Sequence, residues 1–295
     1  MLTIGTRGSK LALWQAHFFQ AKLKEIGLES QLEIIKTQGD RVQHLSFDKL
    51  EGKGFFTKEI EDALLDKRVD LAIHSLKDMP TTQPDGLTLA ALSYRADPAD
   101  LLIIRPESVT EGATLSLADG MTVGTSSARR KAQLLNLHPG VKTVDIRGNV
   151  PTRLNKARTG EVDAVLLAAA GLERLELETG ELKVIRLNPK EFVPAPGQGV
   201  MAVQTREDDQ DLRRKLAQLH NRNAGDCTNV ERQVLRLLGG GCQTPLGVHC
   251  SIDANHNFHA IAAIAERWDA PVKTVRHSSS THAGLAETIF GLLKG

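Results

Sequence analysis

The stretch VDLAIHSLKDMP, residues 69–80, decides the fold class of this chain. Its apolar part, residues 69–74, is short enough for one buried strand, and Ser75, Lys77 and Asp78 follow directly after it. Similar short apolar runs alternate with amphipathic helical stretches along the chain on both sides. This alternation predicts largely parallel sheets covered by helices, which is the arrangement of an α/β fold.

Two series of alternating elements are expected. The first has strands at residues 2–5, 32–37, 69–74 and 87–92. Its helices run from Ser9 to Gly27 and over residues 57–66, the latter with Ile60, Leu64 and Leu65 inward. The second series has strands at residues 101–104, 122–124, 142–146 and 164–167. Its helices begin after Ser126 or Ser127 and after Asn149.

Two connections rich in proline and glycine, residues 94–98 and 193–199, enclose the second series. They predict a double crossover hinge, after which a strand at residues 200–204 returns to the first series. Farther on, helices precede consecutive strand-like runs, which indicates a small α+β domain with an antiparallel sheet. The predicted division is domain 1 at residues 1–95 and 197–207, domain 2 at 99–193 and domain 3 at 208–295. The first two are expected to be hinged, doubly wound α/β domains.

The composition is that of a globular protein, with 41% hydrophobic residues, 25% charged residues and a net charge of +1. So small a net charge argues against nucleic acid or an anionic membrane as a partner. Neither a signal-peptide pattern nor a bilayer-spanning apolar run is present, so we expect a cytoplasmic protein. Cys227, Cys242 and Cys250 lack C-x-x-C spacing, so no metal site is expected.

Cations recur where the expected strands end. Ligands of open parallel sheets bind beyond the carboxyl ends of the strands, so these positions carry the most functional weight. The cations are Arg7, Lys77, Arg129, Arg130, Arg147, Arg153 and Arg174. We therefore expect a distributed anion-binding site.

Arg129, Arg130 and Lys131 fall in the first turn of an expected helix. The helix dipole and the free N–H groups favour anions there, so each cation costs up to about 1 kcal/mol. A bound carboxylate or phosphate would remove that conflict, because guanidinium groups bind carboxylates through two parallel hydrogen bonds. The alternative interpretation is a set of solvated surface cations.

Asp78 also has two interpretations. A carboxylate facing a basic cleft can accept a hydrogen bond from a pyrrole-type N–H and stabilise positive charge on a ring. An aspartate shortly before Pro80 can equally cap a turn. His74, at the end of the same strand, is expected to pack rather than to act as a base.

Cys242 follows three glycines, which leave its side chain accessible, as a reactive thiol requires. Cys227 and Cys250, in a helical stretch and a strand, are interpreted as small buried hydrophobic residues. Lys53 lies between two glycines in a segment that lacks the pattern of a nucleotide P-loop. That segment is expected to be a loop that carries a cation near the cleft.

Eight short blocks together resemble the porphobilinogen deaminase family. They are TRGS at residues 6–9 with Leu11 and Ala12, GKG at 52–54, HSLKDMP at 74–80, GTSSARR at 124–130, RGN at 147–149, AGL at 170–172, PAPGQG at 194–199, and GGC at 240–242 with Pro245 and Gly247. Each block alone is weakly specific, but their common order from residue 6 to residue 247 is highly specific.

The resemblance implies two α/β domains similar to type II periplasmic binding proteins and a third domain that carries a cofactor on Cys242. The implied cofactor is a dipyrromethane, held by a thioether. The implied enzyme is a monomeric transferase of tetrapyrrole and haem biosynthesis. It joins four porphobilinogen molecules head to tail, releases ammonia at each addition and frees hydroxymethylbilane by hydrolysis.

The resemblance also implies a role for each site residue. Asp78 is the implied catalytic residue, in contact with pyrrole nitrogens. The residues implied to bind the cofactor, besides Cys242, are Ser75, Lys77, Thr125, Ser127, Arg129, Arg130 and Arg147. Those implied to bind substrate are Arg7, Lys53, Arg153 and Arg174. The alternative function is a non-enzymatic module that binds small anions, and a covalent adduct on Cys242 would discriminate between the two.

Overall fold

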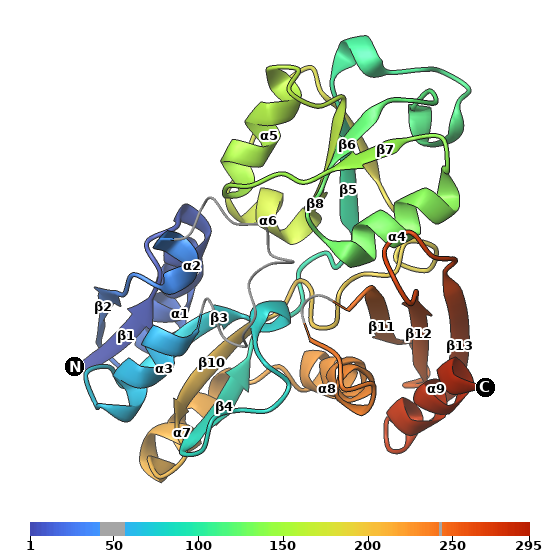
Figure 1. Ribbon diagram of the computed structural model, residues 1–295. Coiled ribbons are helices and arrows are strands. Elements are labelled where there is room, and N and C mark those ends of the chain that lie inside the picture. The colour runs from blue at the N-terminus through green and yellow to red at the C-terminus, as the bar shows by residue number, and fades with distance from the viewer. Residues whose placement is uncertain (42–56, 242–243) are drawn as a thin grey trace. The chain divides into compact units, whose positions relative to one another are not determined.

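The computed structural model describes residues 1–41, 57–241 and 244–295 (Figure 1). Contacts divide this part of the chain into two compact units. Unit 1 comprises residues 1–41, 57–96 and 199–226, and unit 2 comprises residues 97–198, 227–241 and 244–295. Within these ranges the strands form two five-stranded sheets and one three-stranded sheet.

Unit 1 is built on a mixed sheet with the strand order β2-β1-β3-β10-β4. The strands are β1 (Leu2–Thr6), β2 (Ser30–Ile34), β3 (Leu71–Ser75), β4 (Leu87–Leu92) and β10 (Met201–Arg206). β1 runs parallel to β2 and β3, whereas β10 runs antiparallel to β3 and β4. The strand predicted at residues 200–204 is β10, and it does return to the first series.

Helices cover both faces of this sheet. They are α1 (Lys10–Glu25), α3 (Lys58–Leu65) and α7 (Gln210–Leu216), and the short α2 (Gln38–Arg41) follows β2. Successive residues of a strand point to opposite faces of a sheet. Accordingly Leu71 and Ile73 pack in one core with Phe19 of α1, while Ala72 packs in another with Ile60 of α3.

Leu65 does not pack inward, so that part of the prediction is wrong. Its side chain is 45% exposed, while Ile60, Ala63 and Leu64 form the buried face of α3. Consecutive helical residues are separated by roughly 100° around the axis, so a residue next to the centre of the buried stripe can face solvent.

The second five-stranded sheet, in unit 2, has the strand order β7-β6-β8-β5-β9. The strands are β5 (Asp100–Ile104), β6 (Thr122–Gly124), β7 (Lys142–Val144), β8 (Ala164–Ala168) and β9 (Lys183–Arg186). β6 runs parallel to β7 and β8, whereas β5 runs antiparallel to β8 and β9. The helices of this region are α4 (Ala128–Leu137), α5 (Val150–Arg158) and α6 (Ala169–Arg174).

Unit 2 also contains the antiparallel sheet β11 (Leu246–Ile252), β12 (Phe258–Ile264) and β13 (Lys273–Ser279). Helices α8 (Arg222–Leu237) and α9 (Leu285–Lys294) contribute Val234 and Ile289 to the core on one face of it. On the other face Val193 packs with Ile261 and Ala263. The connection at residues 193–199 is therefore anchored to the small sheet.

Short 3-10 helices complete the described elements: η2 (Leu76–Asp78), η3 (Pro106–Ser108), η4 (Thr114–Ser116) and η5 (Ala217–Leu219).

The predicted fold class, two α/β sheets and a small antiparallel sheet, is confirmed, but the two five-stranded sheets are mixed rather than largely parallel. Two strands end earlier than expected: β2 stops at Ile34 rather than at residue 37, and β7 stops at Val144 rather than at residue 146. The Ser126 hydroxyl accepts the N–H of Ile146 at 3.0 Å and donates to its carbonyl at 2.7 Å. The Ser126 side chain thus binds both backbone groups of Ile146, which a neighbouring strand would otherwise bind.

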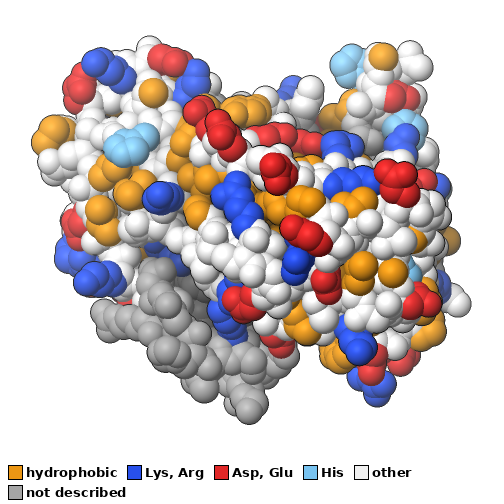
Figure 2. All heavy atoms as spheres, turned by 90° about the horizontal axis from the view of Figure 1, so that it is seen from above, with side chains coloured by type: hydrophobic (Ala, Val, Ile, Leu, Met, Phe, Trp, Pro, Cys, Tyr) orange, Lys and Arg blue, Asp and Glu red, His pale blue; other side chains and the backbone are white. Residues whose placement is uncertain are grey.

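The surface carries charges of both signs. On the face shown in Figure 2, Lys and Arg side chains are interspersed with Asp and Glu, in keeping with the net charge of +1.

Candidate functional site

The Asp78 turn begins where β3 ends. Leu76 is fully buried and Met79 is 2% exposed, so these two side chains anchor the turn in the protein core. Asp78, in contrast, is exposed. The Leu76 N–H donates to the Val200 carbonyl at 2.9 Å, and the Met79 N–H donates to the Leu76 carbonyl at 3.2 Å. Backbone groups and buried apolar side chains therefore hold the turn, and the carboxylate of Asp78 is presented at the surface.

The other sequence-predicted residues of unit 1 lie at the same sheet edge. β1 and β3 are adjacent and parallel, so Arg7 after β1 and the residues after β3 follow strand ends on one side of the sheet. Gln15 of α1 donates from Nε2 to the Ser75 hydroxyl at 2.8 Å, which fixes that side chain. The structure thus brings together Arg7, Ser75, Lys77 and Asp78. Lys53 lies outside the described residues.

His74 packs inside the protein, as expected. It is 6% exposed, and its Nε2 lies 3.1 Å from Gln204 Oε1. The pKa of His74 is lowered to about 4, chiefly by burial; the hydrogen bond to Gln204 acts in the opposite direction, and the positive charge of Arg7 contributes to the lowering. The imidazole is therefore neutral near pH 7.

In unit 2, Arg129 and Arg130 are buried against Asp100. Asp100 Oδ2 accepts from Arg129 Nη1 at 2.6 Å, and Oδ1 accepts from Arg130 Nε at 3.0 Å and Nη2 at 2.7 Å. Gln198 Nε2 donates to the same Oδ1 at 3.0 Å. Burial by itself would raise the pKa of Asp100, but the two guanidinium charges and these hydrogen bonds hold it well below its usual range.

Neither interpretation of this cationic turn anticipated Asp100, and the solvated-surface interpretation is wrong. Arg129 and Arg130 are only 4% and 6% exposed, because the chain itself supplies a carboxylate to them. One carboxylate neutralises only one of two guanidinium groups, so an excess positive charge stays buried. Arg129 Nε is buried as well and has no hydrogen-bond acceptor among the described residues. A ligand with carboxylate groups fits this surplus charge and donor.

The start of α4 is held by hydroxyl groups. Ser127 is the N-cap, because its hydroxyl accepts the Arg130 N–H at 3.4 Å, whereas Ser126 binds Ile146. Thr125 is 1% exposed, and its hydroxyl accepts the Ser127 N–H at 3.3 Å. These contacts set the position of the turn from which the two arginines extend.

The three remaining arginines follow the neighbouring strands. Because β6, β7 and β8 are parallel, the residues after them lie at one edge of the second sheet. Arg147 follows β7 and is half-buried, and Arg153 in α5 donates from Nε to the Gly148 carbonyl at 2.8 Å. Arg174 in α6, after β8, is 7% exposed. The structure therefore gathers the unit 2 cations at one sheet edge.

Cys242 and Gln243 lie outside the described residues, but Gly241 before them and Thr244 after them are described. α8 ends at Leu237, and Gly239 has a φ of +63°, which glycine adopts without strain. The Gly241 N–H donates to the Thr244 hydroxyl at 3.0 Å, and the Thr244 N–H donates to the Gly241 carbonyl at 3.0 Å. Cys227 and Cys250 are buried, as predicted.

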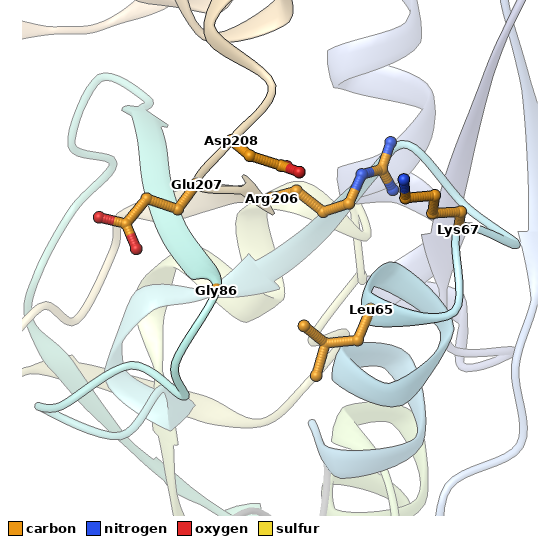
Figure 3. Close-up of a pocket in the computed structure, with 6 residues that line it drawn as sticks. All are labelled: Leu65, Lys67, Gly86, Arg206, Glu207 and Asp208. Atoms are coloured by element: carbon orange, nitrogen blue, oxygen red, sulfur yellow. The ribbon is translucent and has the colours of Figure 1, made fainter.

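A shallow pocket of about 430 Å³ lies at the other edge of the unit 1 sheet (Figure 3). Leu65, Lys67, Gly86, Arg206, Glu207 and Asp208 line it. Arg206 ends β10, which is antiparallel to β3, so this pocket and Asp78 lie at opposite ends of β3. Three of its residues, Arg206, Glu207 and Asp208, are consecutive in the sequence. Figure 3 shows the side chains of Arg206 and Glu207 pointing in opposite directions.

Sequence reasoning missed Asp100, Gln198 and Gln204. Asp100 is an acid at the start of an apolar strand and is fully buried, which is a recognisable signal for a partner of opposite charge. Nothing local identifies that partner, because Arg129 is 29 residues away.

In the described ranges, no helix has the length and apolarity needed to cross a membrane.

Fold and site together define an α/β protein with an acidic turn at one sheet edge and clustered arginines at another. Residues 2–214 match the family described as "Porphobilinogen deaminase, dipyromethane cofactor binding domain", and residues 226–278 match "Porphobilinogen deaminase, C-terminal domain". The chain belongs to the porphobilinogen deaminase family.

The relatives are similar over most of their length. The porphobilinogen deaminase of Chloroherpeton thalassium is 42% identical over 260 residues, covering 88% of this chain and 81% of the relative. That of Nitratidesulfovibrio vulgaris strain Hildenborough is 44% identical over 268 residues, covering 90% and 83%.

The matched solved structures have low sequence identity and low TM-scores. An ancestral arginine-binding protein bound to arginine is 15% identical with a TM-score of 0.40, covering 74% of this chain and 89% of that one. An amino acid transporter substrate-binding protein from Streptococcus pneumoniae is 16% identical with a TM-score of 0.40, covering 81% and 90%.

Proposed function

We propose that this chain condenses four porphobilinogen molecules head to tail and releases hydroxymethylbilane. At each addition the bond between the methylene carbon and the amino nitrogen of porphobilinogen breaks, ammonia leaves, and a carbon–carbon bond forms as the acceptor ring loses a proton. The observation that carries the proposal is the exposed Asp78 on a turn held by backbone hydrogen bonds and buried side chains, in a chain of the porphobilinogen deaminase family.

Asp78 is the proposed catalytic residue. Positive charge develops on the pyrrole ring of the substrate as ammonia departs, and a fixed carboxylate beside the ring nitrogen stabilises that charge. The buried Leu76 and Met79 hold the turn before the substrate arrives, so little reorganisation is needed. Ser75 and Lys77, on the same turn, are proposed as supporting contacts.

The arginines are proposed to bind the carboxylates. Each porphobilinogen carries two carboxylates, so negative charge accumulates as the chain grows, and a single cation cannot neutralise it. The unit 2 edge supplies Arg147, Arg153 and Arg174, and the unit 1 edge supplies Arg7. Lys53 is proposed to contribute one further cation. Guanidinium groups suit this task because they bind carboxylates with two parallel hydrogen bonds.

A dipyrromethane is proposed to be joined to Cys242 through a thioether. When bound, it supplies the pyrrole carbon to which the first substrate is joined. The surplus positive charge of Arg129 and Arg130 and the buried Arg129 Nε suit the carboxylates of such a group. Thr125 and Ser127 hold the turn that carries these arginines. We further propose three domains divided at the predicted boundaries, a monomer, and a cytoplasmic location, which suits a chain with the buried thiols Cys227 and Cys250.

The test measures the mass of the intact purified protein and its turnover of porphobilinogen. We expect one species heavier than the chain by a two-pyrrole unit, mapped to the peptide that contains Cys242, and production of hydroxymethylbilane. Cys242→Ser should lose both the adduct and the turnover. The matched controls Cys227→Ala and Cys250→Ala change buried thiols and should keep the adduct.

An unmodified chain that binds small carboxylates without consuming porphobilinogen would overturn the proposal. That result would favour the anion-binding module instead. Full activity of Cys242→Ser would overturn the attachment site but not the reaction.

A further inference from the structure

Gln204 lies at the centre of a buried polar network in unit 1. Its side chain is fully buried on β10. Gln204 Nε2 donates to Glu61 Oε1 at 3.1 Å and to Gln83 Oε1 at 2.8 Å, and Gln204 Oε1 lies 3.1 Å from His74 Nε2. Three segments distant in the sequence therefore meet at one amide group.

The chemistry of the amide determines the direction of each hydrogen bond. A glutamine side chain has two N–H donors and one carbonyl acceptor. Both donors of Gln204 are used by Glu61 and Gln83, so its carbonyl must accept from His74. His74 is therefore the tautomer with the proton on Nε2. The lowered pKa of His74 agrees with a neutral ring.

Two partners of Gln204 lie on either side of Asp78 in the sequence. His74 precedes the turn at the end of β3, and Gln83 follows it. Gln83 also donates from Nε2 to the Pro80 carbonyl at 3.1 Å, which closes the segment after Asp78. One buried side chain thus holds both ends of the segment that carries Lys77 and Asp78.

We propose that Gln204 is a positioning residue that holds the Asp78 carboxylate in place for the reaction. The proposal rests on the function proposed above. Gln204 does not touch the substrate and acts through the Asp78 turn. A shift of the carboxylate by a fraction of an ångström weakens its contact with the developing charge, while binding of substrate carboxylates by the arginines is unaffected.

A double-mutant cycle between Gln204 and Asp78 tests this role. Gln204→Leu removes all three hydrogen bonds, and Gln204→Glu keeps the side-chain size and the acceptor for His74 but loses both donors. We expect each to lower kcat on the order of 10- to 100-fold with KM little changed. In an Asp78→Asn background the same changes should lower kcat by less than about 2-fold, because the residue through which Gln204 acts is already disabled.

Thr205→Val is the matched control. Thr205 is the next residue of β10, is equally buried, and donates to the Asp70 carbonyl at 2.8 Å, away from the Asp78 turn. Its effect on kcat should be small and the same in both backgrounds. Intact mass should show the same cofactor content in all variants.

Equal losses of kcat from Gln204 changes with and without Asp78 would overturn the positioning role, as would a loss confined to KM. If Gln204→Leu does not fold, Gln204→Glu carries the same cycle. A wild-type chain that does not consume porphobilinogen would contradict the proposed function, and the inference with it. Additive effects on an active wild type would overturn the inference alone.

Discussion

The carboxylate of Asp100 accepts two hydrogen bonds from the guanidinium of Arg130, at 3.0 and 2.7 Å, with both side chains buried. Asp100 begins β5, and Arg130 lies in the first turn of α4. Gln198, in the second crossover connection, binds the same carboxylate and also donates to the Pro98 carbonyl at 2.7 Å, in the first. Through Gln198, Asp100 therefore links the arginines to both connections.

Asp100→Asn should destabilise unit 2. The change keeps the shape but leaves two buried guanidinium groups without a counter-charge, which costs about 3–5 kcal/mol. Urea denaturation measures the loss. The control is Asp269→Asn, which removes an exposed ion pair with Arg267 and should change little. A loss no larger than that of the control would contradict the role of Asp100.

The stabilisation by Asp100 should also depend on pH. Because the pKa of Asp100 is lowered on folding, this stabilisation is complete above the ordinary pKa of 3.8 and is lost as the pH falls below that value.

His74→Gln should make the protein less sensitive to mild acid. The pKa of His74 falls from 6.5 to about 4 on folding, so the unfolded chain takes up a proton first as the pH drops below 6.5. Stability from this group is complete above pH 6.5 and declines until the pH reaches about 4. The wild type should lose roughly 2 kcal/mol between pH 7 and pH 5 that the variant keeps. Denaturation curves at both pH values measure the difference, and the exposed His17→Gln is the control. Parallel pH dependence in His74→Gln and wild type would refute the assignment.

Asp78→Asn should abolish most turnover without unfolding the chain. The side chain is exposed and the backbone hydrogen bonds of the turn do not depend on its charge, so the melting temperature should be nearly unchanged. Loss of the carboxylate facing a developing cation lowers kcat by about 100-fold or more. The exposed Asp85→Asn, farther along the same loop, should retain normal kcat. If Asp78→Asn turned over substrate at the wild-type rate, the residue would have no catalytic role.

Limiting porphobilinogen should produce a ladder of covalent species on Cys242. Each step adds one ring and two carboxylates, so the species should differ by a constant mass and separate on anion exchange by increasing negative charge. Arg129 and Arg130 variants should fail at or before the first addition. Arg147, Arg153 and Arg174 variants should accumulate intermediate lengths, because loss of a bidentate contact costs on the order of 2 kcal/mol.

Arg158→Gln is the control for this series. Arg158 lies in the last turn of α5, at the other end from Arg153, and is exposed. It should give the wild-type ladder. Mass spectrometry after substoichiometric substrate detects each species. A wild type that shows only the two-pyrrole form and free product would mean that the chain does not grow in separable steps on this cysteine.

Much of the fold could be read from the sequence because its determinants are local. Apolar runs of strand length, amphipathic helices and caps such as Ser9 and Asn149 depend on neighbours within a few residues, and both caps are observed. The positions of Asp78 and Arg147 beyond strand ends follow from the same local pattern together with the parallel course of the strands.

The tertiary structure alone decided how the polar side chains pair. Asp100 meets Arg129 and Arg130, and Gln204 meets His74 across 130 residues of sequence. Such partners are chosen by the register of adjacent strands and by the cost of burying an unpaired polar group, and no short stretch of sequence encodes either. For the same reason the sequence identified the arginines of α4 as anion-binding candidates. Only the folded chain shows that these arginines already bind the carboxylate of Asp100.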